Sequence, residues 1–281
     1  MRCDSHVHIV GSAQKYPQVP ERTYLAGVAS VETLKRLGAA RGITRFVIVQ
    51  PSFYGSDNSM TLDALDALGG DGRGVAVIDP KTTSPETLAK FHQRGVRGLR
   101  INLYSPMKSP SGDTLESSFA AIAAAARTMD WHVQVIAPLP VLLAKINLLA
   151  GAPVPIVIDH YGLYGQERPA SFVGRCLLGL ISLPHVWMKL SAPYRHDRGP
   201  LNTVPDREWL AALIDAAPDR CVWGSDWPHP PSHEQQKGAS LEAPYRALSY
   251  DELVDEFLAA LPSADVAEGI MGDNAERLFG F

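Results

Sequence analysis

Short apolar segments rich in β-branched residues alternate along the chain with longer segments of helical period. Most short segments are apolar throughout, which is typical of parallel strands covered on both faces. We predict strands at 2–8, 45–50, 74–79, 96–102, 132–137, 155–160, 186–191 and 221–226. We predict helices at 30–41, 84–94, 115–129, 141–150, 168–180 and 206–217. Ser30, and Ser84 before Pro85, are the expected N-caps of two of these helices.

This alternation predicts the fold class. About eight β/α units in 281 residues match a (β/α)₈ TIM barrel, an α/β fold formed here by one domain over residues 1–281. No linker-like change in composition and no repeat divides the chain. An open doubly wound sheet is the alternative. It is disfavoured because no glycine-rich phosphate turn follows the first predicted strand.

Composition and charge exclude several classes of partner. The chain is 46% hydrophobic and 20% charged, as an ordinary globular protein is. Its 26 basic and 30 acidic residues give a formal charge of −4, which provides no field to attract nucleic acid or a membrane surface. The absence of a signal-like segment predicts a cytoplasmic protein. Three cysteines in unrelated contexts argue against a disulfide framework.

The first predicted strand carries two histidines, His6 and His8, on one face, because side chains two positions apart in a strand point the same way. Such a pair can be purely structural. Here, however, His160 ends the sixth predicted strand and Asp226 ends the eighth. Polar groups at the carboxyl ends of barrel strands converge on one cavity. Three imidazoles and one carboxylate suit a divalent metal, or an acid/base and oxyanion site without metal.

Two arginines are candidates for binding an anionic substrate. Arg100 and Asn102 share one face of the fourth predicted strand, and Arg195 follows the seventh. A buried arginine needs an anionic partner, so a structural ion pair is one interpretation of Arg100. The interpretation we favour is a substrate carboxylate, which a guanidinium group binds with two parallel hydrogen bonds.

The segment after the second predicted strand offers further polar contacts. Gln50, Ser52 and Tyr54 are expected to supply amide and hydroxyl groups to the substrate. Asp57 and Asn58 follow closely, and they have a simpler interpretation as caps of the next helix.

Long loops follow the first, fourth and eighth predicted strands, at 9–29, 103–114 and 227–249. In a barrel such loops usually form a wall or lid over the site. A loop that serves only the contacts of a homo-oligomer would look similar in sequence.

Taken together, these segments resemble the amidohydrolase superfamily, and specifically its amidohydrolase-2 branch, which includes 2-pyrone-4,6-dicarboxylate lactonase and sugar-acid lactonases. The resemblance runs from end to end and is specific for the branch, although not for one substrate. The segments that carry it are 4–8, 49–58 (VQPSFYGSDN), 95–103 (GVRGLRINL), 157–162 (VIDHYG), 186–195 (VWMKLSAPYR), 222–229 (VWGSDWPH) and 273–281 (DNAERLFGF).

The resemblance implies a barrel whose catalytic residues are His6, His8, His160 and Asp226. Asp226 would be the general base that activates water, and the three histidines would polarise the substrate carbonyl and stabilise the oxyanion.

Metal-dependent members of the family would add a lysine or glutamate on strand four and a histidine at the end of strand five. This chain has Arg100 and the segment 133–136 (VQVI) at those places. The resemblance therefore implies an enzyme that requires no cofactor or depends only weakly on metal. The alternative is one zinc or manganese ion on His6, His8 and Asp226.

The function implied is hydrolysis of a carboxylated lactone, of the 2-pyrone-4,6-dicarboxylate, aldarolactone or muconolactone type. The pyrone-dicarboxylate lactonase would carry another arginine shortly after the strand-four arginine, where this chain reads YSPMK at 104–108. A different carboxylated lactone is therefore an equal candidate. A metal-dependent decarboxylase or lactone isomerase on the same barrel is one alternative. A non-catalytic small-molecule binder is another.

Overall fold

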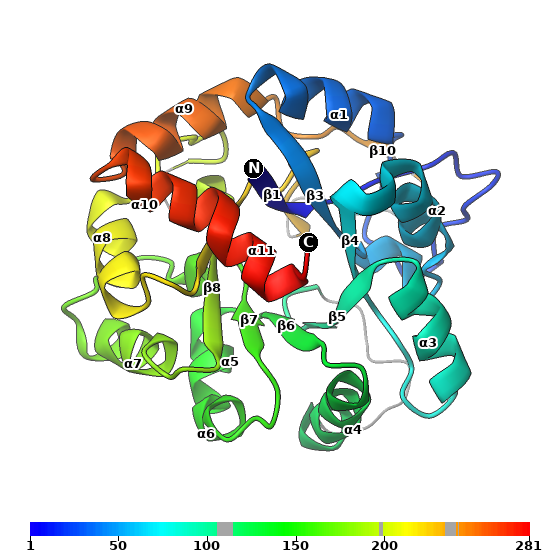
Figure 1. Cartoon of the computed structure of the whole chain (residues 1–281), viewed down its shortest axis with the longest axis horizontal. Helices are drawn as coiled ribbons and strands as arrows, with labels where there is room; N and C mark the ends of the chain where they lie inside the picture. Colours follow the sequence, from blue (N-terminus) through cyan, green and yellow to red (C-terminus); the bar gives the residue numbers. More distant parts are fainter. Residues whose placement is uncertain (106–114, 197–198, 234–239, 241) are drawn as a thin grey trace.

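The computed structural model describes residues 1–105, 115–196, 199–233, 240 and 242–281. Within them, eight parallel strands follow one another around a nearly closed barrel, with helices outside the strands (Figure 1). The predicted TIM barrel is confirmed. The strands are β1 (Arg2–Val7), β3 (Ile43–Val49), β4 (Gly72–Ala76), β5 (Val96–Asn102), β6 (His132–Ile136), β7 (Ile156–Ile158), β8 (Val186–Ser191) and β9 (Cys221–Gly224).

Most helices lie between consecutive strands, as parallel β/α units require. They are α1 (Val31–Ala40), α2 (Ser59–Leu68), α3 (Pro85–Gln93), α4 (Leu115–Thr128), α5 (Leu139–Ala144), α6 (Ile146–Ala150), α7 (Phe172–Ile181), α8 (Arg207–Ala216), α9 (Tyr250–Ala260), α10 (Ala264–Glu268) and α11 (Asn274–Phe279). Short 3₁₀ turns include η1 (Ser52–Tyr54), η2 (Gly69–Asp71), η3 (His160–Leu163) and η4 (Pro193–Arg195), and a π-helical turn, η6 (Gly269–Asp273), lies between α10 and α11.

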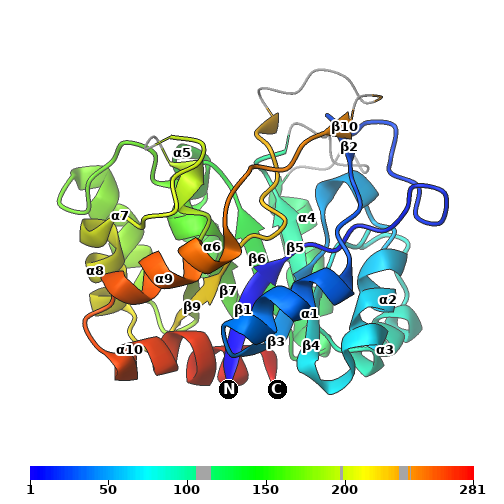
Figure 2. The same cartoon turned by 90° about the horizontal axis from the view of Figure 1, so that it is seen from above.

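The two ends of the barrel differ. The chain termini and α11 lie at the amino-terminal end of the strands, and the loops after β1 and β9 lie at the opposite end (Figure 2). There, β2 (Leu25–Ala26) pairs in parallel with β10 (Glu242–Ala243). The loops expected to wall the site are thus joined to each other at the carboxyl ends of the strands. Residues 106–114 of the loop at 103–114, and residues 234–239 and 241 of the loop at 227–249, lie outside the described residues.

The interior of the barrel is packed at its amino-terminal end. Side chains from six strands meet residues of α11 in one buried apolar cluster, formed by Cys3, Val47, Val49, Val75, Val157, Trp187, Val222, Ala275 and Phe279. Such layers make the barrel a filled core with no pore. The polar site can therefore be reached only from the carboxyl ends of the strands.

Most helix and strand boundaries agree with those predicted from the pattern of hydrophobic and polar residues, and the exceptions have local causes. Ser30 and Ser84 are confirmed as N-caps, since each side chain accepts a hydrogen bond from the backbone N–H three residues on. The predicted helix at 141–150 is divided into α5 and α6 at Lys145, whose backbone leaves the helical region. The pattern did not predict α9, α10 or α11 beyond the last strand.

Strands β1 and β9 meet at a seam that closes the barrel. The Asp226 backbone N–H donates to the His6 carbonyl at 2.9 Å, and the His8 N–H donates to the Trp227 carbonyl at 2.8 Å. The buried Asp4 carboxylate crosses the same seam. Its Oδ1 accepts from the Ser225 N–H at 2.9 Å and from the His6 N–H at 3.2 Å.

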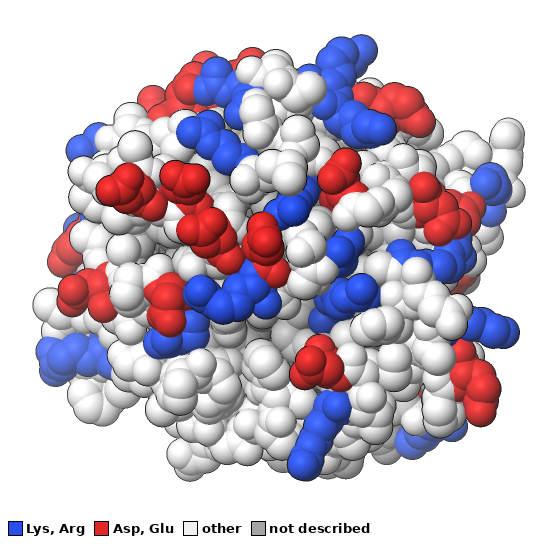
Figure 3. Space-filling model, viewed as in Figure 1, with Lys and Arg blue, Asp and Glu red and all other residues white. Residues whose placement is uncertain are grey.

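Charge on the face of the molecule that Figure 3 shows follows no single sign. Lys and Arg lie among Asp and Glu on the face that carries the chain termini (Figure 3). Among the described residues, no helix is long and apolar enough to cross a membrane.

We expect the seam to depend on the acceptor oxygens of Asp4, whose Oδ2 also accepts from the Tyr250 hydroxyl at 3.0 Å. Asp4→Ala leaves buried N–H groups without an acceptor, at a cost of roughly 2 to 5 kcal/mol in the free energy of unfolding. Asp4→Asn keeps one carbonyl oxygen for both N–H groups and should cost much less. Urea denaturation of the two variants compares them, and equal stability would show that the hydrogen bonds of Asp4 do not hold the seam.

Candidate active site

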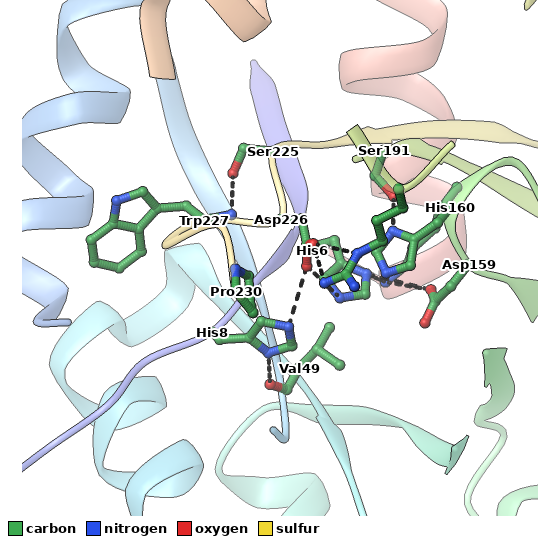
Figure 4. Close-up of polar contacts among 12 residues, drawn as sticks. His6, His8, Val49, Asp159, His160, Ser191, Ser225, Asp226, Trp227 and Pro230 are labelled. Atoms are coloured by element: carbon green, nitrogen blue, oxygen red, sulfur yellow. Dashed lines mark hydrogen bonds and ion pairs between the residues drawn. The ribbon is translucent and has the colours of Figure 1, made fainter. Parts of the chain in front are cut away.

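The structure brings the four predicted catalytic side chains together at the carboxyl end of the barrel. His6 lies in β1, His8 directly follows it, His160 opens η3 and Asp226 follows β9 (Figure 4). All four are buried. Asp226 Oδ1 lies 3.6 Å from His6 Nε2 and 3.3 Å from His8 Nε2. The ring of His160 lies 4.7 Å from that of His6, centroid to centroid.

Local backbone features aim these side chains. His160 and Asp226 both have positive φ, 52° and 58°, which is uncommon for residues other than glycine and concentrates at functional sites. Gly224 ends β9 against β1, where a Cβ atom would lie 2.6 Å from His6 Cβ and 2.8 Å from its backbone nitrogen. Only glycine allows β9 to approach β1 this closely, and this approach places Asp226 beside the histidines.

The two carboxylate oxygens of Asp226 have different surroundings. Oδ2 accepts from the Tyr194 hydroxyl at 2.7 Å and from Nε and Nη2 of Arg195 at 2.9 and 2.7 Å. Oδ1 faces the two histidines. Burial alone would raise the pKa of Asp226, but the charge of Arg195 beside it holds that pKa well below its usual value. Asp226 is therefore an ionised carboxylate.

The hydrogen bonds of His8 fix its role. Its Nδ1 lies 2.8 Å from the Val49 carbonyl oxygen, which can only accept, so Nδ1 carries a proton. In its neutral form, His8 then offers a lone pair at Nε2, 3.3 Å from Asp226 Oδ1. Two acceptors facing each other need a donor between them, and a water molecule or a cation can supply one.

His160 can play the opposite role. Its Nδ1 lies 2.8 Å from the Ser191 hydroxyl oxygen, which can donate to it and leave the proton on Nε2. His160 Nε2 has no hydrogen-bond partner among the described residues. Burial lowers the pKa of His160 well below its ordinary value, partly offset by the charge of Asp226. The neutral ring can therefore present an N–H to a substrate.

The donor set fits a single divalent cation. His6, His8 and Asp226 can each offer a ligand atom, and these atoms lie within 4.8 Å of one another. A second group with the same property, His6, Asp159 and His160, shares His6 with the first. Imidazole nitrogens with a carboxylate oxygen are the ligand types that zinc prefers. A bound cation would polarise a substrate carbonyl as a Lewis acid.

Arg100 lies beside this group and is buried. Its Nη1 donates to the Gln50 carbonyl at 2.9 Å, and its Nη2 lies 3.9 Å from Asp159 Oδ2. Its Nε has no hydrogen-bond partner among the described residues. Arg100 thus combines a long structural contact to Asp159 with an unused donor. Arg195, by contrast, directs its Nε and Nη2 to Asp226.

The side chains after β3 that we predicted to contact substrate mainly form hydrogen bonds that stabilise the loops around them. Gln50 donates to the carbonyls of Gly55 and Asp57 and accepts from the Thr61 hydroxyl at 2.6 Å. The Tyr54 hydroxyl accepts from the backbone of the preceding long loop. Their direct contact with substrate stays a prediction.

The other two residues predicted to contact substrate are Asn102 and Ser52. Asn102 Oδ1 accepts from the backbone N–H groups of Tyr104 and Ser105, at 3.0 and 2.9 Å, and so shapes the turn after β5. Ser52 is half-buried in η1. Of the two residues expected to cap the next helix, Asn58 is the N-cap of α2 but makes no side-chain capping hydrogen bond, whereas Asp57 Oδ1 accepts from the backbone N–H of Ser59, the first residue of α2.

Sequence reasoning missed a polar group beneath the histidines, namely Gln134 of β6, Asp159 after β7 and Lys189 of β8, all fully buried. The signal was a charged or amide residue in the middle of an apolar strand, and an acid directly before His160. Burial lowers the pKa of Lys189 to about 8, with the charge of Asp159 opposing. Tyr194, on Asp226, was missed as well.

A barrel with histidines and an aspartate at the carboxyl ends of its strands defines a class of hydrolytic enzymes. The model of the family described as "Amidohydrolase" matches residues 3–281, and the chain belongs to this family. The family confirms the resemblance seen in the sequence and the assignment as a hydrolase.

Individual relatives match this chain over nearly its whole length. The 4-sulfomuconolactone hydrolase of Hydrogenophaga intermedia is 30% identical over 281 residues, covering 99% of this chain and 88% of that protein. The 2-pyrone-4,6-dicarboxylate hydrolase of Comamonas testosteroni is 29% identical, covering 98% and 89%. A crystal structure of an Agrobacterium tumefaciens protein superposes with a TM-score of 0.81 at 26% identity, covering 100% and 96% of the two chains.

Proposed function

We propose that this protein hydrolyses a lactone that carries at least one carboxylate, of the 2-pyrone-4,6-dicarboxylate, aldarolactone or muconolactone type. The observation that carries the proposal is the buried Asp226 carboxylate, whose Oδ1 lies 3.3 Å from His8 Nε2, with the Arg100 cation buried nearby. The names of two relatives, both lactone hydrolases, support the same reaction.

The acceptor atoms provide a place for the attacking water. A water molecule can donate its two hydrogens to Asp226 Oδ1 and His8 Nε2, which directs an oxygen lone pair towards the cavity. Asp226 takes one proton as this oxygen adds to the lactone carbonyl carbon. The ring C–O bond then breaks, and the proton passes to the departing ring oxygen. The product is a hydroxy acid.

The developing oxyanion needs a hydrogen-bond donor. His160 can present its Nε2–H, whereas neutral His8 has no proton on Nε2 to give. This division of roles revises the expectation that all three imidazoles polarise the carbonyl. Fixed donors of this kind contribute on the order of 3 kcal/mol to the stability of a transition state.

The arginines would select an anionic substrate. Arg100 has an unused donor at Nε, and we propose it as the main anchor of the substrate carboxylate. We propose Arg195 as a second cation on the same cavity, which also fixes Asp226. Contacts from Gln50, Ser52, Tyr54 and Asn102 would be made through the loops that these residues shape.

We propose that the reaction requires no metal. Arg195 already balances the charge of Asp226, which reduces the attraction of this carboxylate for a second cation. Where metal-dependent relatives are expected to carry further ligands, this chain has Arg100 and a strand-five segment without histidine.

Asp226→Asn should lower kcat by about 10² to 10⁴, because an amide cannot take the proton from water. KM should change little, since Asp226 does not anchor the substrate. Asp4→Asn is the matched control, the same change in a second buried aspartate whose carboxylate accepts from backbone N–H groups and from the Tyr250 hydroxyl, and it should keep kcat close to wild type. Steady-state kinetics decide, and an Asp226→Asn enzyme with most of its kcat would remove the assigned role.

Prolonged dialysis against a chelator should leave kcat unchanged, because proton transfer and oxyanion binding rest on groups of the chain. Metal content is measured before and after by elemental analysis. Loss of activity together with a stoichiometric metal ion, and recovery when zinc or manganese returns, would show that the His6, His8 and Asp226 site works as a metal site.

Arg100→Met should lower kcat/KM on carboxylated lactones by about one to two decades, as expected for a charge-assisted bond of roughly 1.5 to 3 kcal/mol. Neutral lactones of the same ring size should be affected far less. Arg195→Met is the comparison, and it should impair both kinds of lactone because it also unpairs Asp226. Equal losses on charged and neutral lactones in Arg100→Met would make Arg100 structural.

A further inference from the structure

The buried polar group beneath the histidines joins three neighbouring strands. Gln134 lies on β6 beside Val157 of β7, Asp159 follows β7, and Lys189 lies on β8. The ring of Phe279 closes the space below, 5.8 Å from Lys189 Nζ. Because both side chains are fully buried, the lysine and the aspartate need partners within the protein.

Gln134 bridges the two charges. Its Oε1 accepts from Lys189 Nζ at 2.7 Å, and its Nε2 donates to Asp159 Oδ2 at 2.9 Å. A side-chain amide combines an acceptor and a donor in this way, whereas a carboxylate cannot donate and an apolar side chain does neither.

The bridge leaves Asp159 Oδ1 with two candidate donors. His6 Nδ1 lies 3.4 Å away and Lys189 Nζ lies 4.0 Å away. The lysine also lies 3.5 Å from His6 Nδ1, to which it could donate. These contacts favour opposite tautomers of His6. Pairing with Asp159 puts the proton on Nδ1 and leaves Nε2 bare, whereas pairing with Lys189 puts the proton on Nε2.

We propose that Gln134 and Lys189 are positioning residues that hold His6 with its proton on Nδ1. Gln134 takes the short hydrogen bond of the ammonium, at 2.7 Å against 3.5 Å from Nζ to His6 Nδ1. Asp159 Oδ1 has no hydrogen-bond partner among the described residues, and the imidazole N–H, with Nδ1 at 3.4 Å, is the nearest donor that can serve it. His6 Nε2 then becomes an acceptor 3.6 Å from Asp226 Oδ1, so that the attacking water can donate one hydrogen to Asp226 and the other to either His6 or His8. This role in catalysis rests on the proposed hydrolysis, while the tautomer itself does not.

Gln134→Met removes both hydrogen bonds of the bridge. The freed ammonium can turn to His6 Nδ1 or to Asp159 Oδ1, and either contact displaces the imidazole N–H from Asp159. His6 should shift towards the Nε2-protonated form, and kcat should fall by about 10², the effect of a small misplacement of a catalytic group. KM should stay nearly unchanged because neither residue touches substrate.

The double variant with Lys189→Met removes the competing donor as well. His6 should then return to Asp159, and kcat should recover in part relative to Gln134→Met alone. A merely structural role predicts that the two losses add. The matched control is Gln18→Met, because Gln18 also makes two hydrogen bonds through its buried amide, both to Ala26, but lies in the loop after β1. It should leave the His6 tautomer unchanged.

The tautomer is read from long-range ¹H–¹⁵N spectra of the chelated, ¹⁵N-histidine-labelled full chain, with His6 assigned from the signals lost in His6→Gln. The proposal expects a protonated Nδ1 in the wild-type protein, a measurement that needs no folded variant and no activity. A protonated Nε2 in the wild type would overturn it, as would an unchanged tautomer and kcat in Gln134→Met. If the protein hydrolyses no lactone, the proposed function is wrong. The spectra would still show whether Gln134 and Lys189 set the tautomer of His6.

Discussion

The seam between β1 and β9 is the constraint on which the site depends. Backbone hydrogen bonds from Asp226 to His6 and from His8 to Trp227 bring the first and last strands into register. Gly224 lets the two backbones approach, and Asp4 ties them together from within. Because the catalytic groups lie at this seam, closing the barrel and assembling the site are one event. An open sheet would hold the same residues on opposite edges.

Charge in the site is arranged as two buried pairs with an imidazole between them. Asp226 is paired with Arg195 at 2.7 Å, and Asp159 is surrounded by Gln134, Lys189 and Arg100. Both pairs need full compensation, because an unpaired charge is costly in a buried site. The first pair keeps a carboxylate ionised beside His6 and His8. The second lies deeper and sets the state of the imidazole.

The barrel and the meeting of His6, His8, His160 and Asp226 could be predicted because strand alternation and the carboxyl-end rule act locally along the sequence. The contacts of Arg195 could not be predicted, because nothing in the neighbouring sequence distinguishes a hydrogen bond to substrate from a hydrogen bond to Asp226. The same is true of Gln50 and Asn102, whose amides are used by their own loops. Lys189 and Gln134 could be noticed in apolar strands, but their pairing depends on which strands become neighbours across the barrel.

Hydrolysis in ¹⁸O-labelled water tests the central claim most directly, because it reports where the oxygen of water enters the product. The purified protein is given a carboxylated lactone, and the product is examined by mass spectrometry. Attack on the carbonyl by the water held at Asp226 predicts one labelled oxygen in the new carboxylate and none in the new hydroxyl. Label in the hydroxyl, or an unlabelled product formed by isomerisation or by loss of carbon dioxide, would contradict the account.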